Sequence, residues 1–393
     1  INPHAEINPE KAYRLQVWDY DLPLRNCDYR QYLQKAVAGF QQKYPNIQVE
    51  LRFLDLVNGP AEMEQALERG DPPDLYCSAF TIPRFNLKYQ IPVGPYFEQV
   101  KLDSQYSMSI QRLVQVDGVL CCFPRWLRMK IWVGNRPLLT AAGLDADQIN
   151  KNGWTWSQLF AIKDKLPAGT FSITGNFIPL GVMRQILPNN CYVEQTGQSG
   201  WNWLQQLKET QRLPDDFNSN MFERFITGKV MLLAGVTPRA AQVVGERLIQ
   251  KGAGWEPVVL PAPELSKARM VHAVEPGVIC VFRNPRRRGG SDHLTAAVKL
   301  GEFLSRYQDT TPWEEMMVIP ATRSGIRKWE QNQGGSRQYV AALECMVNRN
   351  SMAVVKTGEA YQENVAAILH QYLTGKVTHD QTIQKLKEEM YCD

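Results

Sequence analysis

The sequence lacks the patterns that mark membrane spans and the common catalytic centres. No run approaches the roughly 18–20 apolar residues that a helix needs to cross a bilayer. A G-x-S-x-G elbow, an H-E-x-x-H pair, a Walker loop and a dinucleotide fingerprint are all absent. The five histidines are dispersed without a neighbouring ligand pattern. We therefore expect no catalytic residues, no metal site and no cofactor.

An excess of charge of one sign is also missing. The chain has 44 Lys and Arg against 40 Asp and Glu, a formal net charge of +4. So small an excess argues against nucleic-acid binding and against adsorption to a membrane surface. The one dense basic run, Arg286–Arg288, precedes two glycines. Such a run is usually a solvated turn, and a phosphate or partner contact is the alternative.

Eight cysteines are present, without a C-x-x-C pair or a zinc-ligand spacing. Cys121-Cys122 lies in the apolar run Val119–Phe123, which indicates that at least one of the two is buried. The even number fits disulfides in an exported protein as well as buried thiols, and no pairing follows from the sequence. The other six are Cys27, Cys77, Cys191, Cys280, Cys345 and Cys392.

The length of 393 residues favours two domains, and the chain begins with alternating strands and helices. Apolar patterns predict strands ending near Trp18, Phe53 and Cys77, with helices between them. This order implies parallel pairing, and ligands bind beyond the carboxyl ends of such strands. Those ends lie at Trp18–Asp21, Leu54–Asn58 and Ser78–Arg84.

The rest of the chain is richer in helix. Predicted helices cover residues 154–166, 201–213, 220–227, 293–307, 361–373 and 380–391, the first with Thr155 as its N-cap. Short apolar strands are predicted at 230–234 and 278–282. Since no low-complexity linker is present, several short crossings are expected to join the domains.

A series of motifs follows in order along nearly the whole chain. Together they resemble the family 1 extracellular solute-binding proteins of ABC transporters, the maltose-binding-protein-like group. A lone Gly-Asp-Pro-Pro-Asp fits many turns, but the ordered set is specific. The motifs are FQQKYPNIQVE at 40–50, GDPPD at 70–74, VDGVL at 116–120 with Phe123-Pro124, GNRPL at 134–138 with AGLD at 142–145, WTWSQL at 154–159, FITGKVM at 225–231 and Gly375-Lys376 before a terminal helix.

The resemblance implies a periplasmic-binding-protein-like α/β fold with two lobes of interleaved segments and a three-crossing hinge. Crossings are expected near Pro124–Arg125, Val274–Gly277 and Ile319–Arg323. The expected N-terminal lobe comprises residues 11–124 and 276–320, and the C-terminal lobe comprises 125–275 and 321–393, after a polar linker at 1–10. Pro124, Pro276 and Pro320 agree with this, because each falls at a break between apolar runs. Such proteins close on a ligand by hinge motion.

Sugars present hydroxyls to carboxylates, amides and guanidinium groups, and an apolar face to aromatic rings. Each candidate also has an ordinary structural alternative: a helical Trp201 is more often a core residue, and Asp19 can pair with an arginine. Trp132, in an apolar strand, is expected in the core. The ligand-binding candidates are Trp18, Asp19, Tyr20, Asp55, Phe80, Arg125, Trp126, Trp201, Arg239, Glu275, Gly277 and Arg323.

The charge of the ligand stays open at this point. Many sugar-binding members of the family carry an aromatic residue in the loop that here reads Gly235–Arg239. Guanidinium groups bind carboxylate or phosphate, and five arginines are candidates to face the ligand. The alternative is that they pair with Asp19, Asp21 and Glu275. The five are Arg84, Arg125, Arg128, Arg239 and Arg323.

The resemblance implies an exported, non-catalytic receptor, either a cell-surface lipoprotein or a periplasmic protein, that captures a saccharide and delivers it to an ABC permease. Alternatives are a receptor for an anionic solute (a uronate, sugar phosphate or carboxylate) and a ligand-sensing accessory of a two-component system. A monomer is expected. Because Ile1–Lys11 is polar and contains two prolines, the leader that export needs would lie outside this sequence.

Overall fold

The chain divides into two compact units, each built from two chain segments. Unit 1 comprises Ile1–Arg128 and Val274–Gly334, and unit 2 comprises Met129–Ala273 and Gly335–Asp393. The computed structural model describes residues 2–24, 26–78, 88–162, 165–179, 182–183, 186, 200–215, 220–264, 272–286, 289–307, 309–332, 352–354 and 359–390. Within these residues no helix is both long and apolar enough to span a membrane.

The main sheet has eight strands, of which six follow the order β13-β7-β12-β3-β1-β2, while β4 (Gln90–Ile91) and β14 (Met352–Val354) pair with β12. As the alternation of strands and helices predicted, β1 pairs in parallel with β2 and with β3. By contrast, β12 runs antiparallel to β3. The six strands are β1 (Tyr13–Tyr20), β2 (Ile47–Leu54), β3 (Leu75–Ser78), β7 (Phe123–Met129), β12 (His272–Phe282) and β13 (Ile319–Pro320).

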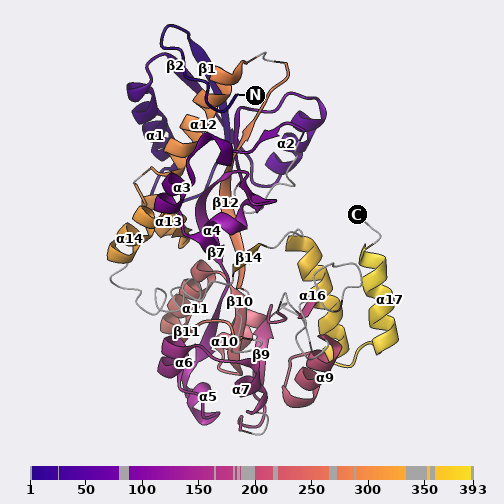
Figure 1. Ribbon diagram of the computed structural model, residues 1–393. Coiled ribbons are helices and arrows are strands. Elements are labelled where there is room, and N and C mark those ends of the chain that lie inside the picture. The colour runs from indigo at the N-terminus through magenta and orange to yellow at the C-terminus, as the bar shows by residue number, and fades with distance from the viewer. Residues whose placement is uncertain are drawn as a thin grey trace. The chain divides into compact units, whose positions relative to one another are not determined.

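Helices α1 (Tyr29–Lys43) and α2 (Gly59–Glu68) lie on opposite sides of β1 and β2 (Figure 1). Asp28 caps α1 by accepting from the Gln31 amide, and Phe40 of its apolar stripe contacts Phe303 of α12 (Ser291–Ser305). The remaining elements of unit 1 are η1 (Gly94–Tyr96), α3 (Gln99–Gln105), α4 (Met108–Leu113), β5 (Gln115–Val116), β6 (Val119–Leu120), α13 (Thr311–Met316) and α14 (Arg323–Asn332).

The GDPPD motif joins α2 to β3. Gly70 has a φ of 66°, a left-handed conformation that glycine adopts without steric cost, and it follows Arg69, the C-cap of α2. At the other end of the motif the buried Asp74 accepts from the Gln16 amide of β1 at 2.7 Å and contacts His293 of α12 at 2.8 Å. The motif therefore ends a helix and fixes β1 and α12 beside β3.

Unit 2 contains a four-stranded sheet in the order β11-β8-β10-β9. Strand β10 is parallel to β9 and antiparallel to β8, which is also antiparallel to β11. The elements are β8 (Ile131–Asn135), α5 (Arg136–Ala141), α6 (Ala146–Asn152), α7 (Trp156–Phe160), β9 (Phe171–Gly175), α9 (Gly200–Thr210), α10 (Met221–Ile226), β10 (Val230–Val236), α11 (Pro238–Gln250), β11 (Pro257–Leu260), β14 (Met352–Val354), α16 (Glu359–Leu373) and α17 (His379–Met390).

Four tryptophans form the centre of the unit 2 core. Trp132 meets Trp154 and Trp156 edge-on, with ring centroids 5.8 and 5.5 Å apart, and Trp156 meets Trp203 at 4.7 Å. All four are at most 5% exposed. The core position predicted for Trp132 is confirmed, and Trp203, on α9, is a core residue as well.

One predicted helix is too long. The periodicity predicted a helix over 154–166, whereas α7 spans only Trp156–Phe160. Ile162 and Leu166 are buried at helical spacing, but they lie in turns after α7, so the apolar pattern continues beyond the helix. The N-cap prediction is confirmed, because Thr155 and Gln158 form a reciprocal capping box.

The borders of the units differ in part from the expected lobe borders. The chain changes unit after residues 128, 273 and 334, compared with expected borders after 124, 275 and 320. The third border differs most, because α14 stays with unit 1: Arg323 Nε donates to the Asp103 carbonyl of α3 at 3.0 Å. Residues 1–10, expected as a linker, belong to unit 1, where the Asn8 amide donates to Tyr13 Oη at 2.9 Å.

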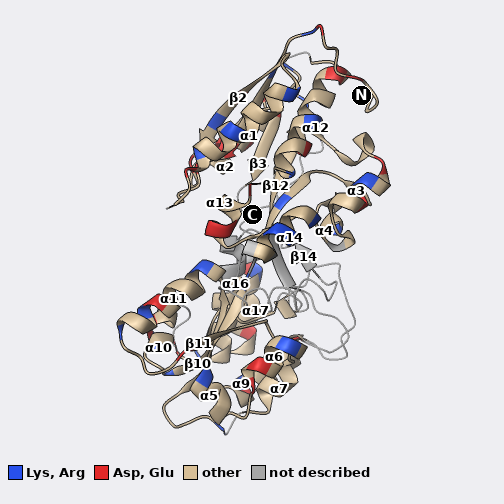
Figure 2. Cartoon of the chain, turned by 90° about the vertical axis from the view of Figure 1, so that its left-hand side faces the viewer, with Lys and Arg blue, Asp and Glu red and all other residues tan. Residues whose placement is uncertain are grey.

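Charged residues of both signs are distributed over both units. Figure 2 shows Lys and Arg interspersed with Asp and Glu on the helices, consistent with a formal net charge of only +4.

Candidate functional site

A buried ion pair lies at the carboxyl end of β1. Arg125 Nη1, from β7, donates to Asp19 Oδ2 at 3.0 Å, and both side chains are at most 4% exposed. Tyr29, the first residue of α1, donates its hydroxyl to the same oxygen at 2.8 Å and accepts from Arg125 Nη2 at 2.6 Å. The Tyr20 amide donates to Asp19 Oδ1 at 2.8 Å. Asp19, Tyr29 and Arg125 thus form one closed triad that links β1, α1 and β7.

The surroundings of Arg125 keep its charge. Burial alone would lower the pKa of Arg125, but the Asp19 carboxylate and Tyr29 outweigh it and raise that pKa well above the usual value. Its guanidinium carbon lies 5.2 Å from the ring centroid of Trp313, on α13. Among the described residues, Arg125 Nε has no hydrogen-bond partner. The triad therefore keeps the Arg125 guanidinium charged beside Asp19 inside unit 1.

Trp126 and Gly277 pack directly on each other. A Cβ added to Gly277, on β12, would lie 2.1 Å from the Trp126 ring, so a larger residue does not fit there. Trp126 is 1% exposed, and its ring centroid is 6.4 Å from that of Trp313. Both residues come from neighbouring strands of unit 1 and have the packing of core residues.

Tyr20 and Asp55 lie at the ends of β1 and β2. The Tyr20 hydroxyl is 2.6 Å from that of Tyr76, and its ring packs against Gly59 of α2. Asp55 is exposed, and its Oδ1 accepts from the amides of Val57 and Asn58 at 2.9 Å each. These two hydrogen bonds lower the pKa of Asp55. Its carboxylate shapes the turn that precedes α2.

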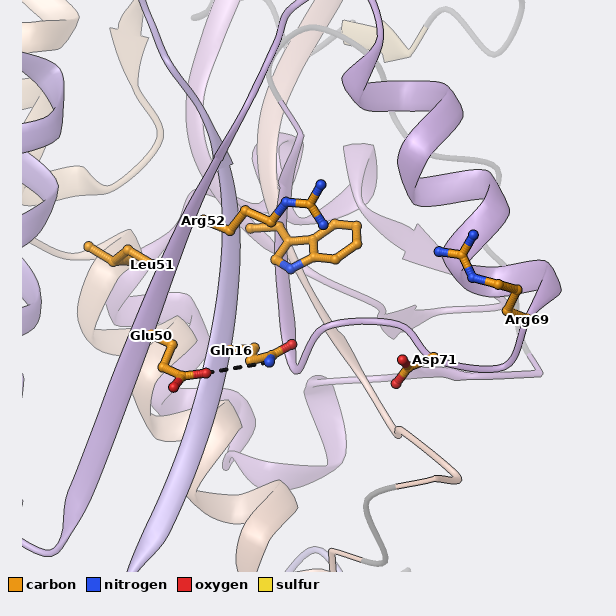
Figure 3. Close-up of a pocket in the computed structure, with 7 residues that line it drawn as sticks. Gln16, Glu50, Leu51, Arg52, Arg69 and Asp71 are labelled. Atoms are coloured by element: carbon orange, nitrogen blue, oxygen red, sulfur yellow. Dashed lines mark hydrogen bonds between the residues drawn. The ribbon is translucent and has the colours of Figure 1, made fainter.

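Trp18 lies in a polar pocket on the face of the sheet, rather than at the sheet edge. The pocket has a volume of about 490 Å³, and Figure 3 shows Gln16 and Glu50 on neighbouring strands, with Arg69 and Asp71 coming from the end of α2. Gln16 Nε2 donates to Glu50 Oε2 at 3.4 Å. The Arg52 guanidinium lies 4.5 Å from the Trp18 ring centroid. Arg52 therefore covers one face of the indole that was expected to stack on a ligand.

Two candidates belong to unit 2. Trp201, on α9, is half-buried and meets His379 and Tyr372 edge-on, with ring centroids 4.3 and 5.6 Å away. Arg239 lies in the first turn of α11 and donates to Gln242 Oε1 at 2.6 Å. Trp201 thus has the packing of a residue at the edge of the unit 2 core.

Several predicted residues have no described side chain. Phe80 and Arg84 lie outside the described residues, and Glu275 is described only as part of the β12 backbone. The side chain of Arg323, by contrast, is described: it lies on α14, and its Nε donates to the Asp103 carbonyl of α3.

The structure brings Asp19, Arg125, Trp126 and Gly277 together in unit 1, and Tyr29 and Trp313 complete this cluster without having been predicted. A signal for Tyr29 was present, because Asp28 is a good N-cap in front of an apolar periodic run and places Tyr29 in the first turn. No local pattern marked Trp313. A role of the twelve candidates in ligand binding stays a prediction.

No family model and no curated protein matches the sequence. Solved structures do match. The chain is similar to the sugar-binding protein MalE from Xanthomonas citri, with 17% identity, a TM-score of 0.68 and 95% of each chain covered. It is also similar to a probable secreted solute-binding lipoprotein from Streptomyces coelicolor, with 15% identity, a TM-score of 0.66 and coverage of 96% of this chain and 98% of that one.

A third similar structure is the cyclic α-maltosyl-1,6-maltose binding protein from Arthrobacter globiformis, with 13% identity, a TM-score of 0.66 and coverage of 96% of this chain and 98% of that one. These three likenesses extend over both units of the chain. The protein therefore has the periplasmic-binding-protein-like fold, two α/β units of interleaved segments, as the motifs predicted.

Proposed function

We propose that the protein is an exported, non-catalytic receptor that captures a saccharide and delivers it to an ABC permease. The observation that carries this proposal is the likeness over 95–98% of both chains to proteins named for sugar or solute binding. The match covers 95–96% of this chain, so the likeness extends over nearly all of it. The three passages of the chain between its units suit a receptor that works by hinge closure.

A neutral saccharide is favoured over an anionic ligand by the similar proteins that are named for sugar binding. The buried pair agrees with this in part, because Asp19 neutralises Arg125 and leaves it no net charge to offer an anion. Arg239 and Arg323 donate to the neutral Gln242 Oε1 and Asp103 carbonyl, so they keep their charge. The ligand is therefore proposed to be recognised through hydroxyls and an apolar ring face.

A thermal-shift panel tests the proposal. Purified protein is heated with neutral oligosaccharides, uronates and sugar phosphates, and each shift is followed by calorimetric titration. Neutral sugars should stabilise the protein, by about 2.7 kcal/mol when the ligand is 100-fold above its dissociation constant. Thermal shifts with the uronates or sugar phosphates alone would mean that the ligand is an anionic solute and not a neutral saccharide. Release of hydrolysed sugar from the bound complex would contradict a non-catalytic receptor.

A further inference from the structure

Four buried cysteines lie in unit 1, around the strands that lead toward unit 2. Cys77, Cys121, Cys122 and Cys280 are at most 3% exposed, and all four are free thiols. Cys122 immediately precedes β7, and Cys280 lies on β12. Since β7 and β12 are hydrogen-bonded neighbours in the sheet, Cys280 lies on the strand next to the one that Cys122 directly precedes.

The alternation of side chains places Cys122 and Cys280 on the same face of the sheet. Their neighbours Phe123 and Ile279 both face Gly301 of α12, where an added Cβ would lie 2.9 Å from the Phe123 ring and 3.6 Å from Ile279 Cγ2. Consecutive side chains of a strand point to opposite faces, so Cys280 points away from α12, and Cys122, directly before Phe123, is expected on the same side. The Cys280 side chain lies close enough to the Cys122 thiol to raise its pKa.

The other two buried thiols have different partners. Cys77 is opposite Ile279 in the β3–β12 register, which puts it on the α12 side of the sheet, and it lies close enough to Asp19 for that carboxyl group to raise the pKa of the thiol. Cys121 Sγ donates to the Val119 carbonyl at 3.4 Å. Of the four buried thiols, Cys122 and Cys280 are therefore the pair that neighbouring strands bring to one side of the sheet.

We propose that Cys122 and Cys280 form a structural disulfide when the protein matures in an oxidising compartment. The oxidant is a protein disulfide of the thiol–disulfide oxidoreductase class. A thiolate of the pair attacks this disulfide and forms a mixed disulfide, which the second thiolate then displaces. One S–S bond forms between Cys122 and Cys280, the S–S bond of the oxidant breaks, and the oxidant leaves as two thiols with the two electrons and two protons.

The reaction belongs to the folding of the chain, before unit 1 closes. Burial, and then donation of its proton toward Cys280, raise the pKa of the Cys122 thiol well above its usual value. The reactive thiolate is therefore scarce once the protein has folded, and exchange is slow in both directions. A bond formed earlier would be protected from reductants by the same burial.

The position of this disulfide gives it a role in the whole molecule. Strand β7 leaves unit 1 after residue 128, one residue before its end, and β12 enters unit 1 at residue 274. The bond would join these two strands inside unit 1 and hold in register two of the three chain passages between the units. The proposal depends on the export part of the proposed function and is independent of the ligand.

Peptide mapping tests the disulfide. The full chain is produced once by export to a bacterial periplasm and once in a reducing cytosol, and free thiols are alkylated in denaturant before digestion with trypsin. Cys121 and Cys122 fall in the tryptic peptide 113–125, and Cys280 falls in the peptide 270–283. We expect these two peptides to be linked in the exported protein and separate after reduction or cytosolic production.

Single variants assign the sulfur atoms. The link should persist in Cys121→Ser and disappear in Cys122→Ser and Cys280→Ser. Alkylation of both Cys122 and Cys280 in the exported wild-type protein would overturn the proposal, as would a link that survives in Cys122→Ser. If a variant does not fold, the peptide map of the exported wild-type protein still shows whether the two peptides are linked.

Saccharide binding is titrated with the same exported preparation. A linked protein that binds no solute would contradict the proposed function and leave the disulfide standing. An exported protein that binds a saccharide but has no Cys122–Cys280 disulfide would contradict the disulfide and leave the proposed function standing.

Discussion

Asp19 and Asp21, two residues apart at the end of β1, occupy opposite environments. Asp19 is buried and pairs with Arg125, whereas Asp21 is half-exposed and pairs with Arg30. A buried pair excludes water from both charges, so removing one partner leaves the other charge unsolvated. An exposed pair is solvated whether or not it forms. The two arginines should therefore respond very differently to substitution.

Arg125→Met should destabilise the protein by about 3–5 kcal/mol, because the Asp19 carboxylate stays buried without its cation. The double variant Asp19→Leu/Arg125→Met should lose less than Arg125→Met alone, because both charges are then gone. Urea unfolding followed by circular dichroism measures both. Arg30→Met is the matched control and should change the unfolding midpoint little. A loss in Arg125→Met as small as in this control would contradict a buried ion pair.

At the residue scale the sequence predicted what depends on near neighbours. The Thr155–Gln158 capping box was visible because its two members are three residues apart. The partner of Asp19 was not identified, because Arg125 is 106 residues away and several arginines were equal candidates. For the same reason the sequence left the pairing of the cysteines open.

At the scale of elements, the short helix α3 is held to α12 by one carboxylate. Glu302 Oε1 lies 2.8 Å from Lys101 Nζ and accepts from Gln105 Nε2 at 3.2 Å. Burial alone would raise the pKa of Glu302, but the hydrogen bond and charge of Lys101, with Lys299 and Gln105, outweigh it and lower that pKa. A lowered carboxyl pKa stabilises the folded state above the unfolded pKa of about 4.5, and this contribution is lost as the pH falls through the lower folded value.

Lys101→Met should therefore reduce stability near neutral pH, and the difference from wild type should shrink as the pH falls below about 4.5, the unfolded pKa of Glu302. Urea midpoints measured from pH 7 to pH 3 report this difference. Lys35→Met, an exposed position on α1, is the control and should show no such convergence. A difference that stays constant with pH would mean that Lys101 acts by packing rather than by its charge.

Elements were predicted well where an apolar pattern and a stop signal coincide. The expected helix at 361–373 corresponds to α16, and Gly375, at a φ of 76°, follows it. The helix expected at 154–166 was too long. Ile162 and Leu166 are buried four residues apart, as in a helix, but they lie in the non-helical segment after α7. Apolar periodicity indicates which residues are buried, and it indicates their backbone conformation only indirectly.

At the scale of the whole molecule, the receptor proposal predicts a change of shape on binding. A saccharide that closes the hinge should lower the radius of gyration, because closure brings the two units together around the ligand. Small-angle scattering with and without the saturating sugar measures this. A sugar that gives no thermal shift should leave the radius unchanged. Tight binding without any decrease would contradict hinge closure.

The sequence by itself determined the fold class, the parallel arrangement of β1, β2 and β3, and the order of motifs shared with solute-binding proteins. These follow from patterns within short stretches, where burial and turn chemistry act between near neighbours. Only the tertiary structure decided that Asp19 pairs with Arg125, that Gly277 gives room to Trp126, that Cys122 meets Cys280, and that α14 stays with unit 1. Each of these depends on which distant strands become neighbours in a sheet, and that is settled by packing over the whole unit rather than by any local pattern.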